Sequence, residues 1–276
     1  MSAELGLQRV KQGGSLRGFS NLMKMDHRSW WRTHRWWINA LLWSVLLCGL
    51  TAIMLFGPNE ELQEASAADI ARVGGETAYL LSVAFTAFFE FGVPVLAIGA
   101  IIQAQDLILG EKQAGLTEWL LAKPVSRRAY ILAKFTANLI PVLVLMIGLP
   151  ALLTYGLVSY RLGEFFPLQP YLAGAGMLAL HTLFYLSLTL FLGTVFNQRG
   201  PILGITLGSV LGGGLLGGLV SPLYYVTPWL LSKSAALAAS GQPLPAPYGA
   251  APVLAAGVGS VLLILGAFLR FERAEF

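Results

Sequence analysis

Six long apolar segments limit what this chain can fold into. Each runs for about 20 residues or more, the length that a helix needs to cross the ~30 Å hydrocarbon core of a bilayer. A soluble helical protein would carry a polar stripe repeating every 3.6 residues, and these segments carry almost none. The sequence therefore predicts an all-α membrane protein with one transmembrane domain over residues 1–276. The six predicted spans are 36–56, 77–102, 129–155, 171–196, 201–220 and 250–269.

The distribution of basic residues predicts the orientation of these spans. Only 12% of the 276 residues are charged, against roughly a quarter in a soluble domain. Fifteen of the 18 Lys and Arg fall on one side of the predicted topology, so the positive-inside rule places both termini in the cytoplasm of a cell-membrane protein. The net charge of +4 then reflects topology and contact with anionic lipid, and we expect no nucleic-acid partner.

Residues 1–35 are basic, and the apolar segment that follows has full length and no small-residue cleavage site. We therefore expect it to stay in the protein as the first span, preceded by an interfacial helix whose Trp rings and bases lie at the headgroup layer.

Cys48 is the single cysteine, so no intramolecular disulfide is expected. His27 and His34 lack a third ligand, and we expect no metal site.

Two ionisable residues fall near the middle of predicted spans. Glu90 lies in the second span and His181 in the fourth, at similar depth. A charge there costs about 2.5–3.5 kcal/mol on insertion scales, so such groups usually face the bundle interior. We expect Glu90 to be buried against other helices, and Pro94 to loosen its helix. A Glu90–His181 hydrogen bond, a role in a substrate path and two separate helix contacts all stay open.

The fifth predicted span is rich in glycine. Small residues at intervals of four let helix backbones approach closely, so we expect a packing face within the subunit or across a dimer. These residues are Gly204, Gly208, Gly212, Gly213 and Gly217. Residues 221–249 then mix aromatics and prolines with an apolar stretch too short to span, which predicts outer helices that enter the bilayer only in part.

The connection between the second and third spans holds a large share of the charge. Residues 108–123 predict an amphipathic helix, about three turns of it after Glu111, with Glu111 and Glu118 on one side and Trp119 among the apolar residues on the other. Pro124 should end this helix, and Ser126 is a favourable N-cap for the next.

Arg127 and Arg128 then fall in the first turn of that next helix, where the helix dipole disfavours cations. Contact with phospholipid headgroups explains the Arg pair in one interpretation, and a docking surface for a cytoplasmic partner explains it in the other.

The stretch GEKQAGLTEWLLAKPVSRRAYILAKF, residues 110–135, resembles the signature of ABC-2 type transporter permeases. In that family a Glu precedes a Gly-Thr, a Leu-rich turn, a Pro-Val-Ser-Arg corner and a Lys in the third span. Leu116 stands where the family has Thr, and Thr117 follows it. The matching residues are Glu111, Gly115, Leu120, Leu121, Pro124 to Arg127, and Lys134.

The resemblance implies a membrane subunit that pairs with a separate ATP-binding subunit, two copies of each forming an exporter. It implies that 108–123 is the coupling helix seated in a cleft of the ATPase, and that ATP and Mg²⁺ bind to the partner. It also implies that Glu111, with Arg127 or Arg128, belongs to the ATPase contact. The residues expected to couple the chain to the ATPase are Glu111, Gly115, Glu118, Trp119, Pro124, Ser126, Arg127 and Arg128. The E-K-Q-x-G form is most similar to the permease of the nitrous-oxide-reductase maturation exporter.

Enzyme signatures are absent from the sequence. It contains neither the G-x-x-x-x-G-K-[ST] phosphate loop nor H-E-x-x-H, so we expect a non-enzymatic chain without a cofactor of its own. Two other classes stay open. One is an ATP-independent channel or secondary transporter with Glu90 and His181 as a proton-linked site, and the other is a membrane scaffold that binds an ATPase and moves no solute.

Overall fold

The structure, a computed structural model, describes residues 14–57 and 67–273. Within these residues all regular elements are helical, and six helices are long and apolar enough to cross a membrane. The predicted class of all-α membrane protein is confirmed. The six helices are Arg35–Phe56, Glu76–Gln113, Arg127–Leu162, Leu168–Val195, Arg199–Leu219 and Ala251–Glu272.

The second of these helices is longer than the sequence predicted. It runs for 38 residues, about 57 Å at 1.5 Å per residue, or nearly twice a hydrocarbon core. Hydrophobicity ends near residue 102, but backbone hydrogen bonding continues through polar residues that pack against protein. Its parts are α5 (Glu76–Phe85), the π-helical turn η1 (Thr86–Glu90), α6 (Phe91–Ala104) and α7 (Asp106–Gln113).

The third helix also contains a π-helical turn beside a proline. It joins α9 (Arg127–Pro141), η2 (Val142–Gly148) and α10 (Leu149–Leu162).

In the second helix, η1 ends four residues before Pro94, at the carbonyl with which a proline ring clashes in a regular α-helix. The wider π-helical turn relieves this clash. It lies in the part of the helix that we expected Pro94 to loosen.

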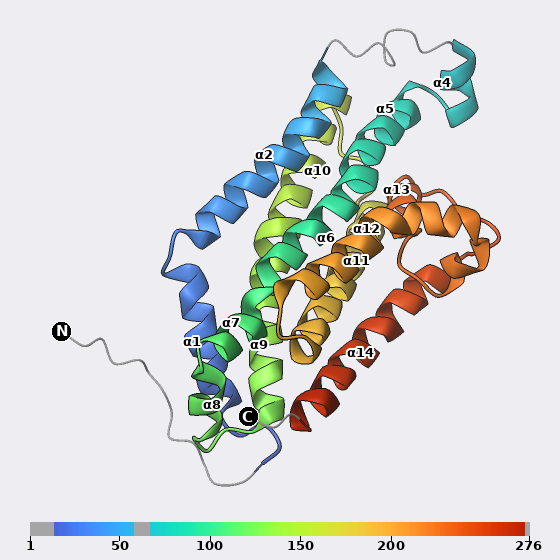
Figure 1. Ribbon diagram of the computed structural model, residues 1–276. Helices are drawn as coiled ribbons and strands as arrows, with labels where there is room; N and C mark the ends of the chain where they lie inside the picture. The colour runs from blue at the N-terminus through green and yellow to red at the C-terminus, as the bar shows by residue number, and fades with distance from the viewer. Residues whose placement is uncertain (1–13, 58–66, 274–276) are drawn as a thin grey trace.

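The remaining helices complete a bundle around the fourth span (Figure 1). That span, α11, packs against α14, α13 and α6. The helix α8 follows α7, and α13 lies in the segment predicted to enter the bilayer in part. The bounds are α1 Phe19–Trp31, α2 Arg35–Phe56, α4 Ala67–Val73, α8 Leu116–Leu121, α11 Leu168–Val195, α12 Arg199–Leu219, η3 Ser221–Tyr225, α13 Leu231–Ala239 and α14 Ala251–Glu272.

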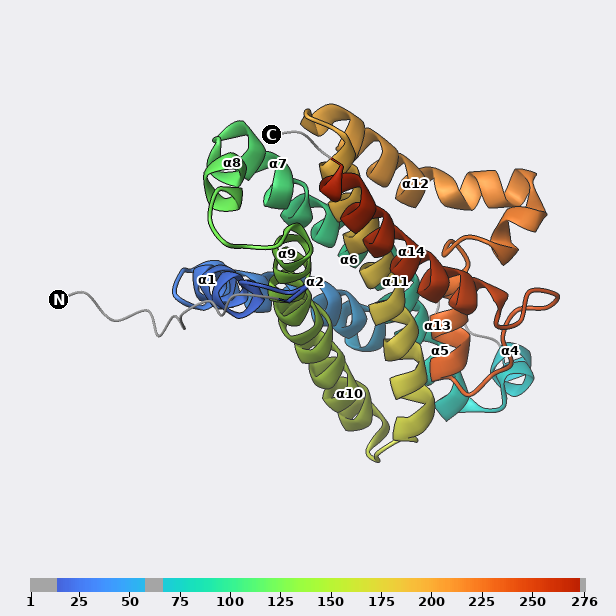
Figure 2. The same cartoon turned by 90° about the horizontal axis from the view of Figure 1, so that it is seen from below.

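One end of the bundle gathers segments that are far apart in the sequence. There α1, α7, α8, the start of α9 and the end of α14 lie together, while α4 lies at the opposite end (Figure 1). Seen along the bundle, α1, α8 and α9 form one side and α12 another (Figure 2). We call the end that carries α7 and α8 the junction end.

Two packed clusters hold the bundle together. At the junction end the ring of Tyr130 stacks on that of Phe271 with centroids 5.1 Å apart, among buried residues from α1, α9 and α11. Further along, an aromatic cluster joins α5 and η1 to α11 and includes Phe85, Phe89 and Tyr171. The outer surface of α2, α12 and α14 carries many exposed apolar side chains, such as Leu219 at 81%, as expected for helices in contact with lipid.

Candidate functional site

The segment predicted as one amphipathic helix, 108–123, is two helices. Helix α7 continues the second span to Gln113, and α8 begins at Leu116. Gly115 between them has φ 67°, a left-handed conformation that glycine adopts without the strain a Cβ causes. The prediction of a single helix is therefore wrong. The left-handed Gly115 interrupts the helix, although helix propensity and the amphipathic pattern both indicated one uninterrupted helix.

Glu111 lies at the centre of a polar network that joins three helices. Its carboxylate forms an ion pair with Lys134 of α9 and accepts a hydrogen bond of 2.7 Å from the Tyr130 hydroxyl. Lys134 also pairs with Asp26 of α1 at 3.0 Å. The Lys134 residue is 5% exposed, so these bonds form in a low-dielectric setting where an unpaired charge is costly.

A neighbouring bond extends the contact between α1 and α9. The indole nitrogen of Trp30 donates to Asn138 Oδ1 at 2.9 Å, and Asn138 Nδ2 donates to the Lys134 carbonyl oxygen at 2.8 Å. Burial raises the pKa of Asp26 above its ordinary value of 3.8, and the nearby Lys134 opposes that rise. Helix α1 thus packs closely against the third span through buried polar bonds as well as through Leu22.

Lys112 connects the same segment to the end of the fourth span. Its ammonium donates to the carbonyl oxygens of Gly193 and Thr194, each at 3.1 Å. These are carbonyls of the last turn of α11, which lack helical partners and carry the negative end of the helix dipole. Gln113 adds a bond of 3.4 Å to the Asn197 carbonyl, so α7 is bound to the α11–α12 corner.

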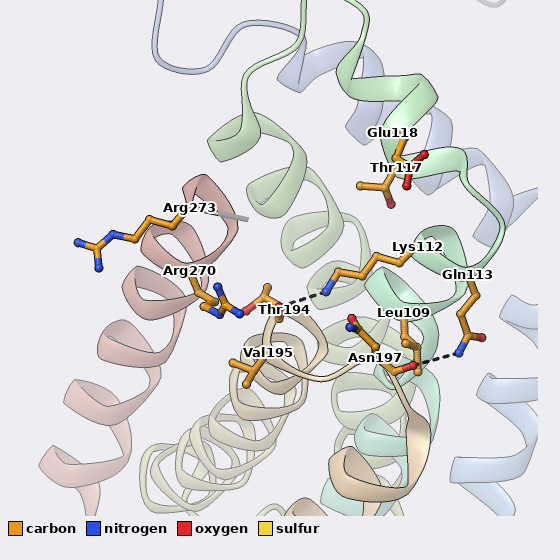
Figure 3. A pocket seen from close by; sticks show the side chains of 10 residues that line it. All are labelled: Leu109, Lys112, Gln113, Thr117, Glu118, Thr194, Val195, Asn197, Arg270 and Arg273. Atoms are coloured by element: carbon orange, nitrogen blue, oxygen red, sulfur yellow. Dashed lines mark hydrogen bonds between the residues drawn. The ribbon is translucent and has the colours of Figure 1, made fainter. Parts of the chain in front are cut away.

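A cavity of about 500 Å³ lies beside these bonds, between α7, α8, the end of α11 and the end of α14 (Figure 3). Three cations and one carboxylate line it, and Lys112 reaches across it to Thr194. The lining residues are Leu109, Lys112, Gln113, Thr117, Glu118, Thr194, Val195, Asn197, Arg270 and Arg273.

Arg127 and Arg128 bind within the chain. Arg127 Nη1 donates to the carbonyl oxygens of Phe271 and Glu272 at 3.1 and 2.8 Å, and Arg128 Nε pairs with the Glu272 carboxylate at 2.5 Å. The pair therefore satisfies the end of α14, and these bonds offset its position against the dipole of α9. Ser126 accepts a bond from the Ala129 amide, which confirms the predicted N-cap.

Helix α8 presents apolar side chains at the junction end. Leu116 is 51% exposed and Trp119 is 61% exposed, with the Lys123 ammonium 4.4 Å from the Trp119 ring centroid. Glu118 and Pro124 are also exposed, whereas Thr117 is buried. A short surface helix with two exposed large apolar residues next to charges has the composition of a protein contact.

The structure does not bring Glu90 and His181 together. His181 is buried with its ring 4.9 Å from that of Tyr185, and no hydrogen bond joins it to Glu90. The Glu90 side chain is exposed on the surface of the single chain. Within the single chain, the prediction that other helices bury Glu90 is therefore wrong.

The glycines of α12 divide into two faces. A Cβ on Gly213 would lie 2.3 Å from the Trp229 ring, and one on Gly217 would lie 2.3 Å from the Tyr224 ring, so these two allow close packing within the chain. Around Gly204, Gly208 and Gly212, apart from the backbone of α12 itself, no atom of the described residues lies within 4 Å of a Cβ position. That face is open to lipid or to a second subunit.

Sequence reasoning missed the partners of Glu111 and Lys134. Asp26 is one acid among many bases before the first span, and Asn138 lies inside an apolar segment. A lysine and an asparagine four residues apart in a predicted span signal a need for buried partners, but not which ones. Among residues 14–57 and 67–273 no group of three or more His, Cys, Asp or Glu is arranged to hold a metal ion.

This architecture defines a multi-pass helical membrane protein. A family model described as "ABC-2 family transporter protein" matches residues 20–276. The chain therefore belongs to the ABC-2 transporter family, whose members form membrane components of ABC transporters and are generally not catalytic themselves. No curated protein is similar enough to count as a match.

Proposed function

We propose that this chain is the permease subunit of an ATP-driven exporter in the cell membrane. It works as a dimer, with the junction end in the cytoplasm and a separate ATP-binding subunit, which holds ATP and Mg²⁺, seated on α8. One observation carries the proposal: α8 exposes Leu116 and Trp119 on a segment bound to the third and fourth spans. The excess of Lys and Arg on that side supports its orientation.

The bonds of α7 supply a route for mechanical coupling. Glu111 connects α7 to α9, and Lys112 connects it to the end of α11. Because α6 and α7 are parts of one continuous helix, a displacement of α8 by the ATPase acts on the second, third and fourth spans together. Closure of the nucleotide subunits would then switch access from the inside to the outside.

Co-purification of the cognate ATPase tests the contact. We expect Leu116→Ser, Trp119→Ser to reduce the ATPase recovered with the permease by at least about tenfold, since large apolar residues at an interface centre carry much of the affinity. Phe165→Ser is the matched control, because Phe165 is exposed in the loop after α10, at the opposite end. Undiminished recovery with the α8 variant would contradict the proposal.

A second measurement separates an exporter from a scaffold. ATP hydrolysis by the reconstituted complex should respond to a transported solute, whereas a scaffold's hydrolysis would be indifferent to peptides, lipids, ions and drugs alike.

Within the family, the E-K-Q-x-G form of residues 111–115 supports the nitrous-oxide-reductase maturation branch. Restoration of that maturation by this chain, in a strain lacking its own permease, tests the narrower assignment.

A further inference from the structure

Two adjoining cavities open between the first and second spans. The first, of about 370 Å³, lies near the junction end and includes Arg35 and Asp106 in its lining. The second, of about 320 Å³, continues along the spans and is mainly apolar. Asn39, Ile102 and Gln103 line both. We call the pair of adjoining cavities, polar at the junction end and apolar further in, the α2–α6 crevice.

The polar part of the α2–α6 crevice holds an unused acceptor. Asn39 Oδ1 accepts hydrogen bonds from Gln103 Nε2 at 2.8 Å and from the Trp43 indole at 3.0 Å. These bonds fix the Gln103 amide, yet its Oε1 is buried with no hydrogen-bond partner in the described part of the chain. An acceptor without a donor is unfavourable, and it suits a ligand that brings a hydrogen-bond donor.

A half-buried stripe of the second span runs from this crevice toward the exposed Glu90, which lies outside the lining of both cavities. Glu90, Pro94 and Ile98 fall at i, i+4 and i+8, on one helix face, and Ile98 lines the apolar part of the crevice. Val95, another lining residue, is five positions from Glu90, about 7.5 Å along the helix axis. Phe91, beside Glu90, is also exposed.

A carboxylate at this depth requires a partner or water. Glu90 makes no hydrogen bond or ion pair with any residue that the structure describes, and lipid offers none. An apolar crevice that leads to an unpaired carboxylate is complementary, in shape and in charge, to an amphipathic molecule with a positive group.

We propose that the α2–α6 crevice and Glu90 bind an amphipathic organic cation, with its apolar body along Trp43, Val95 and Ile98 and its charge at the Glu90 carboxylate. This rests on the proposed export function, because it names the class of substrate that the path accepts. The binding itself is a property of the permease alone, so it can be measured without the ATPase.

The experiment measures binding of tetraphenylphosphonium to the purified permease in nanodiscs, with empty nanodiscs subtracted. Tetraphenylborate, matched in size and opposite in charge, is the second probe. We expect Glu90→Gln to weaken tetraphenylphosphonium binding by at least about tenfold, Ile98→Trp to weaken it by filling the crevice, and Glu90→Asp to stay within about threefold of the parent protein. Glu164→Gln, an exposed acid outside the spans, should change nothing.

Equal tetraphenylphosphonium affinity in the parent protein and a folded Glu90→Gln variant would overturn the proposal, as would equally tight binding of tetraphenylborate. If Glu90→Gln instead dissociates the permease dimer and leaves cation binding unchanged, Glu90 lies between two copies of the chain and the proposal is wrong. Undiminished ATPase capture by the α8 variant, with cation binding intact, would count against the docking site alone.

Discussion

Lys134 of the third span pairs with Asp26 of α1 across 3.0 Å, and the same ammonium binds Glu111 of the second span. One buried lysine thus holds together a helix before the first span and the two spans that flank the α8 connection. The apolar pattern of these segments gives no reason for that arrangement. It follows from the need of a buried ammonium for carboxylate partners.

Replacing Lys134 by methionine should destabilise the protein strongly. Methionine fits the volume, but it leaves the carboxylates of Asp26 and Glu111 without their cation, at a cost of about 3 kcal/mol or more. Thermal unfolding of the purified protein in nanodiscs measures the loss. Lys123→Met is the control, because Lys123 is exposed, and equal melting temperatures for the two variants would contradict the buried ion pair.

Asp26 should make stability depend on pH in a defined direction. Burial raises its pKa above the ordinary value of 3.8, so the folded state binds the proton more tightly than the unfolded state. The contribution of Asp26 to stability is then fully present below pH 3.8 and is lost as the pH rises through the folded pKa.

Asp26→Asn removes this titration. Comparing the melting temperatures of variant and parent between pH 4 and pH 7 should show the parent losing stability relative to the variant as pH rises. A difference that stays constant over this range would show that the pKa is not raised.

The glycines of α12 should differ in their tolerance of alanine. Gly213→Ala places a Cβ 2.3 Å from the Trp229 ring, and such overpacking typically costs about 1–3 kcal/mol. Gly208→Ala meets no atom within 4 Å and should be neutral or slightly stabilising in the isolated subunit, since alanine favours helix. Chemical or thermal unfolding of both variants tests this, and similar losses for the two would exclude the close contact with Trp229.

A charge exchange tests the role of the Arg pair. If Arg128 serves to bind α14 through Glu272, Arg128→Glu should weaken ATPase recovery indirectly, and adding Glu272→Arg should restore it. If Arg128 instead contacts the ATPase, the double variant should recover no more ATPase than the single one. Co-purification with the parent protein as reference distinguishes the two.

Much of the architecture was predictable because hydrophobic length alone specifies a membrane span. The predicted first span, 36–56, differs from Arg35–Phe56 by one residue at its start, since a charged residue and a glycine bound it. The second and third helices are longer than the predicted spans, because each helix continues beyond the end of its apolar segment. Helix propensity did not reveal the break at Gly115. The left-handed conformation of this glycine depends on how α7 and α8 are placed in the tertiary structure.

By itself the sequence determined the membrane class, the number of spans, the Ser126 cap and the resemblance of residues 110–135 to the family signature, all of which depend on local composition and spacing. Tertiary structure alone decided that Asp26, Glu111 and Lys134 meet, that Arg127 and Arg128 satisfy the end of α14, and that Glu90 faces outward. These outcomes depend on which helix faces approach each other in space, and a charged or polar side chain does not encode the identity of its distant partner.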